Sequence, residues 1–267
     1  MSDTAFPIIT MTTDFGYKDP FIAEMKGVIL SINRNASIID LTHDIQTFNI
    51  DEAAFVINSS YKYFPDGSLH IVVIDPGVGS SRRAMIIRSD KHYFVGPDNG
   101  VFSLILNGDK LARCVEIANA KYVLKMQSPT FQGRDIFAPA AAWLSSGVDL
   151  SEIGPEIEDP TLIAFPIPQI SEAGLTGEVI YVDRFGNAIT NITERDLAKI
   201  GDDWVMQLEG LIPTLSKYYS ELQIGKLGCL VNSSGHLEIF SYRGSAAALF
   251  NVGIGNRIVV SAASKLR

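Results

Sequence analysis

Apolar residues in the first part of the chain alternate between short strand-like runs and longer stretches with helical spacing. Residues 7–11, 37–41 and 70–74 are the strand-like runs, and continuous runs of this kind are typical of parallel strands buried on both faces. Between them, residues 21–32 and 51–64 place apolar side chains at helical spacing and predict helices. This alternation predicts a layered α/β domain with a mostly parallel sheet.

The same part of the chain contains a hairpin signal and a further helix signal. Residues 85–88 and 93–95 predict two paired strands joined by a tight turn. Residues 135–144 are Ala-rich and predict a helix in spite of one proline. For the first helix, Asp19 is the expected cap, and Pro20 stands where a missing N–H group is tolerated.

The pattern changes near residue 165. Beyond it come short strand candidates separated at close intervals by Gly and Asn, which indicates a small antiparallel β-barrel or sandwich. The strand candidates are residues 177–182, 188–192, 228–232, 237–240 and 257–262. We therefore predict an N-terminal α/β domain over residues 1–165, a linker over 166–175 and a C-terminal β-barrel domain over 176–267.

The composition is that of a globular chain with an acidic balance. Of the 267 residues, 46% are hydrophobic and 19% are charged, which allows a substantial core and argues against a disordered chain. The formal net charge of −8 argues against a broad phosphate-binding surface, so we expect no nucleic-acid partner. An acidic protein would suit a small cationic ligand, but net charge alone does not establish one.

The cysteines and the apolar runs indicate in which cellular compartment the protein is expected. Cys114 and Cys229 lack a metal-ligand spacing, and we expect both to be buried small hydrophobic residues in a reducing, cytoplasmic setting. Residues 1–10 lack the basic and long apolar regions of a signal peptide. No apolar run reaches the roughly 18 residues of a membrane span, so no membrane partner is expected.

Several familiar site patterns are missing from the sequence. The four histidines form no paired spacing, so a zinc site and other metal sites are not expected. Gly77 and Gly79 lack the third glycine of a dinucleotide-binding fingerprint, and the residues after them do not open a helix. The sequence also contains no P-loop lysine motif and no G-x-S-x-G nucleophile elbow.

Two aspartates, Asp14 and Asp75, stand just after predicted strands, and each is followed closely by glycine. In open α/β sheets, ligands bind beyond the carboxyl ends of the strands. A carboxylate placed there can accept hydrogen bonds from a ribose diol or orient a nucleophilic water. On the pattern alone, however, such aspartates are more often loop caps or Asx-turn residues.

Two arginine-containing segments each leave two interpretations open. Either Arg82 or Arg83 could face inward and pair with Asp75, although adjacent arginines are usually both solvated. The pair Arg134 and Asp135 precedes a helical segment. It could be a plain cap with a surface charge, or a buried ion pair that holds a loop.

Short polar segments recur in one order between residue 12 and about residue 247. They are TTDFG at 12–16, DPGVG at 75–79 with Arg82, GPDNG at 96–100, GRDIFAP at 133–139, DRFGN at 183–187 with Asn191 and Ile192, and GHLEI at 235–239 followed by residues 244–246. In this order they resemble the adenosine-forming S-adenosyl-L-methionine (SAM) hydrolases. These enzymes are also called SAM hydroxide adenosyltransferases and are relatives of the fluorinases and chlorinases.

The resemblance implies an architecture and an assembly. Family members have an α/β N-terminal domain and a β-barrel C-terminal domain, in agreement with the two-part pattern above. They assemble as homotrimers, and each SAM site lies between the N-terminal domain of one subunit and the C-terminal domain of the next. SAM is then the substrate, adenosine and L-methionine are the products, and no cofactor is expected.

The resemblance also implies roles for individual substrate-binding residues. Asp14 would hold both ribose hydroxyls, and Phe48 would line the pocket for the ribose and its 5′-carbon. Phe185 would stack on adenine, Asn187 would read the edge of the base, and Asp183 would bind the methionine ammonium group. Ser233 and Ser245 fall in the segment that would meet the methionine end of SAM. Asp19, which follows the TTDFG segment, is also expected to bind the substrate.

Asp75 and Arg82 match two of the three residues that position and activate water in the hydrolases. The halogenases replace both, which favours hydroxide over halide chemistry. The third hydrolase residue is a histidine just before Gly-Arg-Asp, where this chain has Gln132. Glutamine can hold a water or Arg82 by hydrogen bonds but cannot take up a proton near neutral pH. If the histidine acts as a base, the rate would drop, since positioned bases contribute about 10²–10⁴-fold.

The resulting hypothesis is an in-line attack of water or hydroxide on the ribose 5′-carbon of SAM. Asp75, Arg82 and Gln132 are the expected catalytic residues. A weakened protein that binds SAM or adenosine as a sensor is one alternative, because of Gln132. Halide-dependent synthesis of a 5′-halo-adenosine is another. A structural module without a small ligand is hard to reconcile with so many polar loop segments.

Overall fold

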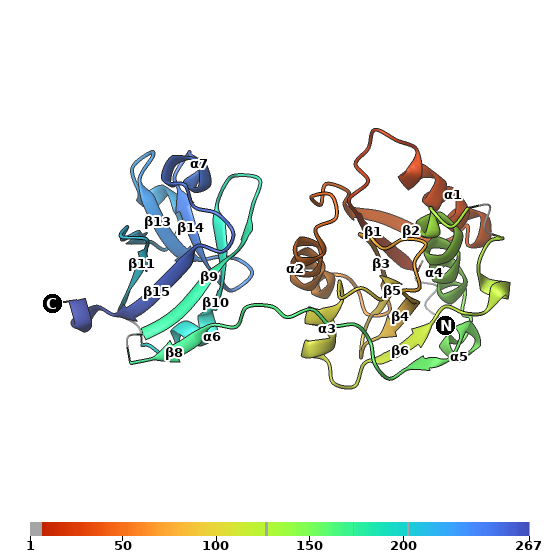
Figure 1. Ribbon diagram of the computed structural model, residues 1–267. Coiled ribbons are helices and arrows are strands. Elements are labelled where there is room, and N and C mark those ends of the chain that lie inside the picture. The colour runs from red at the N-terminus through yellow and green to blue at the C-terminus, as the bar shows by residue number, and fades with distance from the viewer. Residues whose placement is uncertain (1–6, 126–127, 173, 202, 267) are drawn as a thin grey trace, which may run out of the picture. The chain divides into compact units, whose positions relative to one another are not determined.

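The computed structural model describes residues 7–125, 128–172, 174–201 and 203–266, and it divides into two compact units (Figure 1). The first unit is Met1–Ala164 and the second is Phe165–Arg267. Strand β8 (Gln169–Ser171) of the second unit lies within the range predicted as a linker. None of the helices in the described part of the chain combines the length and the apolar character that crossing a membrane requires.

The first unit is built on a seven-stranded sheet with the order β2-β1-β3-β5-β4-β6-β7. The parallel part consists of β2 (Ser37–Thr42), β1 (Ile8–Thr13), β3 (Leu69–Val73) and β5 (Tyr93–Pro97). The antiparallel part consists of β4 (Ala84–Arg88), β6 (Arg113–Glu116) and β7 (Glu156–Ile157). The predicted hairpin is β4 with β5, and the predicted α/β class is confirmed.

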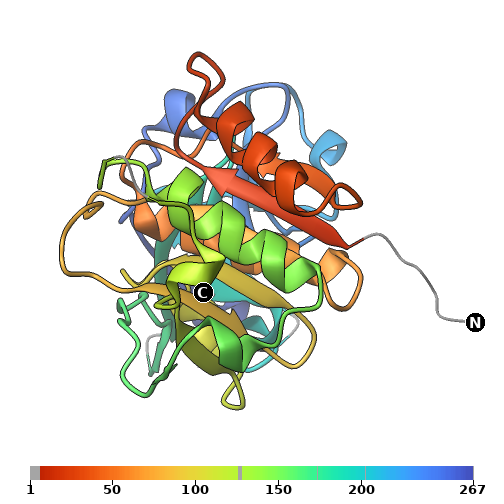
Figure 2. The same cartoon turned by 90° about the vertical axis from the view of Figure 1, so that its right-hand side faces the viewer.

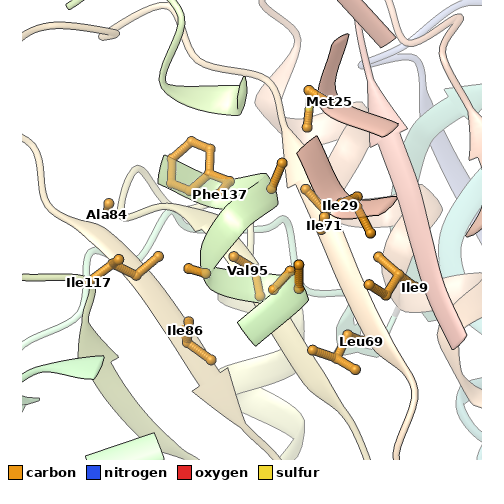
Figure 3. Close-up of a cluster of buried hydrophobic side chains, with 14 of the residues drawn as sticks. Ile9, Met25, Ile29, Leu69, Ile71, Ala84, Ile86, Val95, Ile117 and Phe137 are labelled. Carbon is orange, nitrogen blue, oxygen red and sulfur yellow. The ribbon is translucent and has the colours of Figure 1, made fainter. Parts of the chain in front are cut away.

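Helices cover both faces of this sheet. The helices are α1 (Phe21–Ile32), α2 (Ile50–Ser60), α3 (Ser103–Gly108), α4 (Ala138–Ser145) and α5 (Leu150–Ile153). Figure 2 shows α1 and α4 side by side, and Figure 3 shows Met25 and Ile29 of α1 close to Ile71 of β3. On the other face, Val72 packs in one cluster with residues of α2 and α3. Because both faces are covered, the run 70–74 is apolar without alternation.

The start of α1 corrects one prediction. Pro20 is the N-cap residue, and no side chain caps the helix. The carbonyl of Pro20 accepts the first helical hydrogen bond, from the N–H of Glu24 at 2.9 Å. The helix therefore spans the predicted residues, but it begins one residue after the start that an Asp19 cap implies, and Asp19 is exposed outside it. In α2, by contrast, the Asn49 side chain caps the helix by accepting the N–H of Glu52 at 3.0 Å.

The second unit is a mostly antiparallel sheet of barrel-like shape, in agreement with the prediction (Figure 1). Its strand order is β11-β15-β9-β10-β14-β13-β12, and β8 pairs with β9. The strands are β9 (Gly174–Val182), β10 (Ala188–Thr193), β11 (Trp204–Leu208), β12 (Thr214–Leu215), β13 (Leu227–Val231), β14 (His236–Ser241) and β15 (Arg257–Ala262). The α-helices among the described residues of this unit are α6 (Glu194–Leu197) and α7 (Ala246–Phe250).

A buried pair of histidines lies inside the first unit. The Oγ1 atom of Thr10 lies 2.8 Å from Nδ1 of His70, and Nε2 of His70 lies 3.4 Å from Nδ1 of His92. Burial lowers the pKa of His70 to about 3, with a further contribution from His92, and burial also lowers the pKa of His92. Both imidazoles are therefore neutral in the folded protein at neutral pH.

The histidine pair predicts an acid-sensitive fold. An unfolded histidine takes up a proton near pH 6.5, whereas folded His70 does not, so the free energy of unfolding falls as the pH drops below about 6.5. Between pH 7 and pH 5, His70 should contribute a loss of about 2 kcal/mol. The His70→Gln variant should lose less stability than the parent between these two pH values in urea denaturation. Equal losses in both proteins would contradict this assignment.

Candidate active site

The first unit contains a cavity of about 500 Å³ that lies beyond the carboxyl ends of β1 and β3. Asp14 follows β1 and Asp75 follows β3 by two residues, and both line the cavity. Because these strands are neighbouring and parallel, their ends meet at one edge of the sheet. Phe48 and Gln132, which were also predicted as site residues, line the same cavity. Asp19 is not among its described lining residues.

Asp75 and Arg82 form an ion pair at this edge. Nε of Arg82 donates to Oδ1 of Asp75 at 2.9 Å, and Nη2 donates to Oδ2 of the same carboxylate. The side chains are 5% exposed for Asp75 and 10% exposed for Arg82, so the pair is shielded from solvent. A two-point contact of this kind fixes both the distance and the plane of the two groups.

Two further contacts hold the Arg82 guanidinium. Nη1 donates to the carbonyl of Arg83 at 3.2 Å. The centre of the guanidinium lies 5.5 Å from the centroid of the buried Phe137 ring, a cation–π contact. Phe137 ends a π-helix, Gly133–Phe137, that runs directly into α4. The segment predicted as a plain helix therefore begins with a wider turn beneath Arg82.

Gln132 joins this ion pair through its amide oxygen. Oε1 of Gln132 accepts a hydrogen bond from Nη2 of Arg82. Arginine can only donate, so the amide oxygen must face Arg82 and the amide NH₂ group must point elsewhere. The glutamine can therefore orient Arg82 and donate a hydrogen bond to a second group, but it cannot take a proton from water.

The neighbouring arginine has different partners. Nε of Arg83 donates to Asp98 at 2.8 Å, and Nη1 donates to Asp159 at 2.7 Å. The interpretation that Arg82 and Arg83 are both solvated is therefore wrong. Arg134 also forms an ion pair, with Nε 2.7 Å from Oδ1 of the buried Asp135, which settles the second open question in favour of the ion pair.

Asp14 is joined to the loop that carries Phe48. The backbone N–H of Phe48 donates to Oδ2 of Asp14 at 2.9 Å. Phe48 has a φ angle of 66°, in the left-handed region that costs a bulky residue about 1–2 kcal/mol. Its side chain is 66% exposed, so burial of the ring does not offset this cost. Strain held at a cavity wall is typical of residues that contact ligands.

The second unit contains a separate cavity of about 550 Å³ lined by Asp183, Phe185 and Asn187. Oδ1 of Asp183 accepts the backbone N–H groups of Phe185 and Asn187, at 2.9 and 2.8 Å. Oδ2 accepts from Nδ2 of Asn187 at 3.1 Å. The Phe185 side chain is 77% exposed and presents its ring to solvent. This turn thus displays a carboxylate, an aromatic face and an amide together.

Two predicted serines lie outside the described lining of this second cavity. The Ser245 side chain caps α7 by accepting the N–H of Ala248 at 3.0 Å. It also lies close against Gly186, where an added Cβ would fall 2.0 Å from the Ser245 hydroxyl oxygen, so it supports the Asp183 turn from behind. Ser233 is exposed in the turn between β13 and β14. Their assigned roles stay predictions.

The prediction missed Tyr219 and Glu238. Tyr219 lines the second cavity, and its hydroxyl donates to Oε1 of Glu238 at 2.8 Å. Burial raises the pKa of Glu238, with a smaller contribution from the nearby Asp183, against hydrogen bonds from Asn232 and Tyr219 that lower it. The sequence signal that could have identified Glu238 is its position between Leu237 and Ile239, two apolar residues that are buried in β14.

In the described part of the chain, neither cavity is lined by a group of side chains that could hold a metal ion. Within the parts of the chain that the structure describes, no three His, Cys, Asp or Glu side chains group closely enough to hold one. Cys114 and Cys229 are buried free thiols, as predicted. What the described residues supply is hydrogen bonds, a fixed ion pair and aromatic surface, which suits the binding and alignment of an organic ligand.

Two family models match nearly the whole chain. The model of the SAM hydroxide adenosyltransferase N-terminal domain matches residues 9–154, and the model of the C-terminal domain of the same family matches residues 177–259. Each match falls within one of the two compact units.

Relatives of known activity match over nearly their full length. The (R)-S-adenosyl-L-methionine hydrolase of Methanocaldococcus jannaschii is 36% identical, over 94% of this chain and 95% of the relative. The enzyme of the same name from Salinispora tropica is 34% identical, over 96% and 98%. A fluorinase from an Actinoplanes species is 26% identical, over 96% and 98%.

A solved structure also resembles this fold. A conserved protein from Thermotoga maritima, described as uncharacterized, superposes with a TM-score of 0.89 and 33% identity. The match covers 95% of this chain and 99% of that protein. The fold is therefore shared over nearly the whole length of both chains.

Proposed function

Because this chain belongs to the SAM hydroxide adenosyltransferase family, we propose that it hydrolyses SAM to adenosine and L-methionine. The observation that carries the proposal is the shielded Asp75–Arg82 pair, whose Asp75 and whose partner Gln132 line the first cavity. Hydrolase relatives are 34–36% identical to the chain, whereas the fluorinase is 26% identical, which favours water over halide as the nucleophile.

The reaction is an in-line displacement at the ribose 5′-carbon. The oxygen of a water forms a bond to this carbon while the carbon–sulfur bond breaks, and the bonding electrons pass to sulfur. The positive sulfonium thereby becomes the neutral thioether of methionine, and the water proton is lost to Asp75 or to solvent. Since the sulfonium is already a good leaving group, the task of the protein is to align the water and exclude competing solvent.

Asp75 and Arg82 both act on the attacking water. Two carboxylate lone pairs accept from Arg82, which leaves others to accept a hydrogen bond from water and direct its oxygen at the 5′-carbon. The guanidinium of Arg82 stabilises negative charge that develops on the attacking oxygen. Gln132 holds Arg82 through its amide oxygen, and its NH₂ group donates a hydrogen bond to the attacking water.

The remaining predicted residues bind the two ends of the substrate. Asp14 holds the ribose hydroxyls beside Phe48 in the first cavity. Phe185 stacks on adenine, Asn187 reads the edge of the base and Asp183 accepts the methionine ammonium group. Ser233, Ser245 and Asp19 are assigned to substrate binding by the sequence alone, since they are not among the described lining residues of either cavity.

We further propose that the working enzyme is a homotrimer whose sites combine the first cavity of one copy with the second cavity of another. Family resemblance supports this assembly. The division of the predicted substrate-binding residues between two separate cavities supports it as well.

The activity is tested by incubating the purified protein with SAM, with and without chloride, and identifying products by mass spectrometry. We expect adenosine and methionine at equal rates in both conditions. A 5′-chloro product would contradict the choice of water as nucleophile. SAM that stays intact but raises the melting temperature would instead support the sensor.

Substitutions in the ion pair should slow the chemical step. Asp75→Asn and Arg82→Ala should each lower kcat by about 100-fold or more, because each removes a group that acts on the attacking water. Arg83→Ala is the matched control, since Arg83 is adjacent in sequence but binds Asp98 and Asp159. Unchanged turnover in either of the first two variants would refute the role assigned to that residue.

Mixed assemblies test the shared site. Asp75→Asn damages only the first cavity, and Asp183→Ala damages only the second. If sites combine two copies, unfolding and refolding the two inactive variants together should restore part of the activity, as some sites then receive two intact halves. Each variant refolded alone is the control. Failure to recover activity from a mixture shown to contain both variants in one assembly would contradict the shared site.

A further inference from the structure

The turn that carries Asp14 is held from behind by a row of polar side chains. Thr13, the last residue of β1, places its Oγ1 atom 2.8 Å from Nδ1 of His43. On the far side of the ring, Nε2 of His43 lies 3.0 Å from Oδ1 of Asp40. Thr13 and His43 are 0% and 1% exposed. None of these three side chains has a part in the proposed reaction.

The row ends on a charged group. Burial alone would raise the pKa of Asp40, but Lys26 and His43 beside it outweigh burial and lower the pKa, so Asp40 is a carboxylate. The two ring nitrogens of His43 thus lie between the Thr13 hydroxyl and this carboxylate.

The row also contacts the backbone on either side of Asp14. The Thr13 oxygen accepts the backbone N–H of Phe15, at 3.2 Å. The carbonyl of His43 accepts the N–H of Gly16, at 2.8 Å. The backbone before and after Asp14 is thus tied to one imidazole, which leaves the Asp14 side chain little freedom to turn.

We propose that His43 is a positioning residue that sets the Asp14 carboxylate for the ribose hydroxyls, acting through Thr13. The inference rests on the proposed function, because it takes Asp14 to be the ribose ligand. His43 touches no substrate. Its contribution is to pre-orient a carboxylate that would otherwise lose conformational freedom each time a ligand binds.

An Asp–His–Thr row also resembles the triad of a nucleophilic enzyme, but burial excludes that role. The hydroxyl of Thr13 belongs to a residue that is 0% exposed, at the end of a strand paired on both sides. No substrate carbon can approach it. The reactive edge of His43 is equally closed, with Tyr17 packed edge-on against the ring at 5.2 Å.

The chain provides a matched control for this proposal. Thr10 lies three residues earlier on the same strand, is also 0% exposed, and also bonds Nδ1 of a buried histidine at 2.8 Å. Its partner, His70, has no contact with the Asp14 turn among the interactions described. Thr10→Val and Thr13→Val therefore both remove a buried threonine–histidine hydrogen bond, and Thr13→Val also removes the one that the N–H of Phe15 donates.

The test measures KM for SAM hydrolysis and Kd for adenosine, by calorimetry, in both variants. Thr13→Val should raise both constants about five- to tenfold, the value of one hydrogen bond, and leave kcat within about twofold. Thr10→Val should leave all three near the parent values. His43→Asn should reproduce the effect of Thr13→Val if it folds.

A double-mutant cycle separates positioning from a general loss of structure. In an Asp14→Ala background, Thr13→Val should weaken adenosine binding no further, since its effect passes through Asp14. An equal further loss in that background, or unchanged KM and Kd in Thr13→Val, would overturn the proposal, as would a parent protein that does not bind adenosine. A parent that binds adenosine but releases none from SAM would refute the proposed hydrolysis and leave this cycle measurable.

Discussion

The ion pair between Asp75 and Arg82 is the constraint around which the first cavity is organised. A carboxylate and a guanidinium that are nearly out of solvent must satisfy each other, because an unpaired charge in that place would cost several kcal/mol. The end of β3 supplies the carboxylate, and the segment leading into α4 supplies both the Gln132 oxygen and the Phe137 ring that enclose the guanidinium. Two segments about 50 residues apart in sequence are thereby held at one point.

The pairing also decides which chemistry the cavity can support. A free carboxylate would be a better base, whereas one engaged at two points by arginine is better suited to hold a water in a fixed direction. A carboxylate that orients water without acting as a strong base suits a substrate that already carries a good leaving group. The pairing also explains how glutamine can serve at position 132, where the resemblance implies histidine: the contact with Arg82 requires an acceptor, and the amide oxygen supplies one.

Periodicity in the sequence predicted most of the first unit, because its strands are buried on both faces and its longer helices are amphipathic. Periodicity predicted fewer elements of the second unit, where β11 and β12 were not predicted. The positions of Asp14 and Asp75 at strand ends were readable from the sequence. Their partners were not: nothing in the pattern distinguishes Arg82 from Arg83, or shows that Glu238 is buried, since these depend on which side chains tertiary packing brings close.

The π-helix at Gly133–Phe137 has a consequence for the evolution of this site. Such a turn contains one residue more than an α-helical turn, and it commonly marks a functional position. Its five residues turn through about the same angle as four residues of an α-helix, so the extra residue can be lost or gained without redirecting Gln132 relative to α4. Homologous sequences should therefore differ by single-residue gaps within this segment while keeping the orientation of the residues on either side of it.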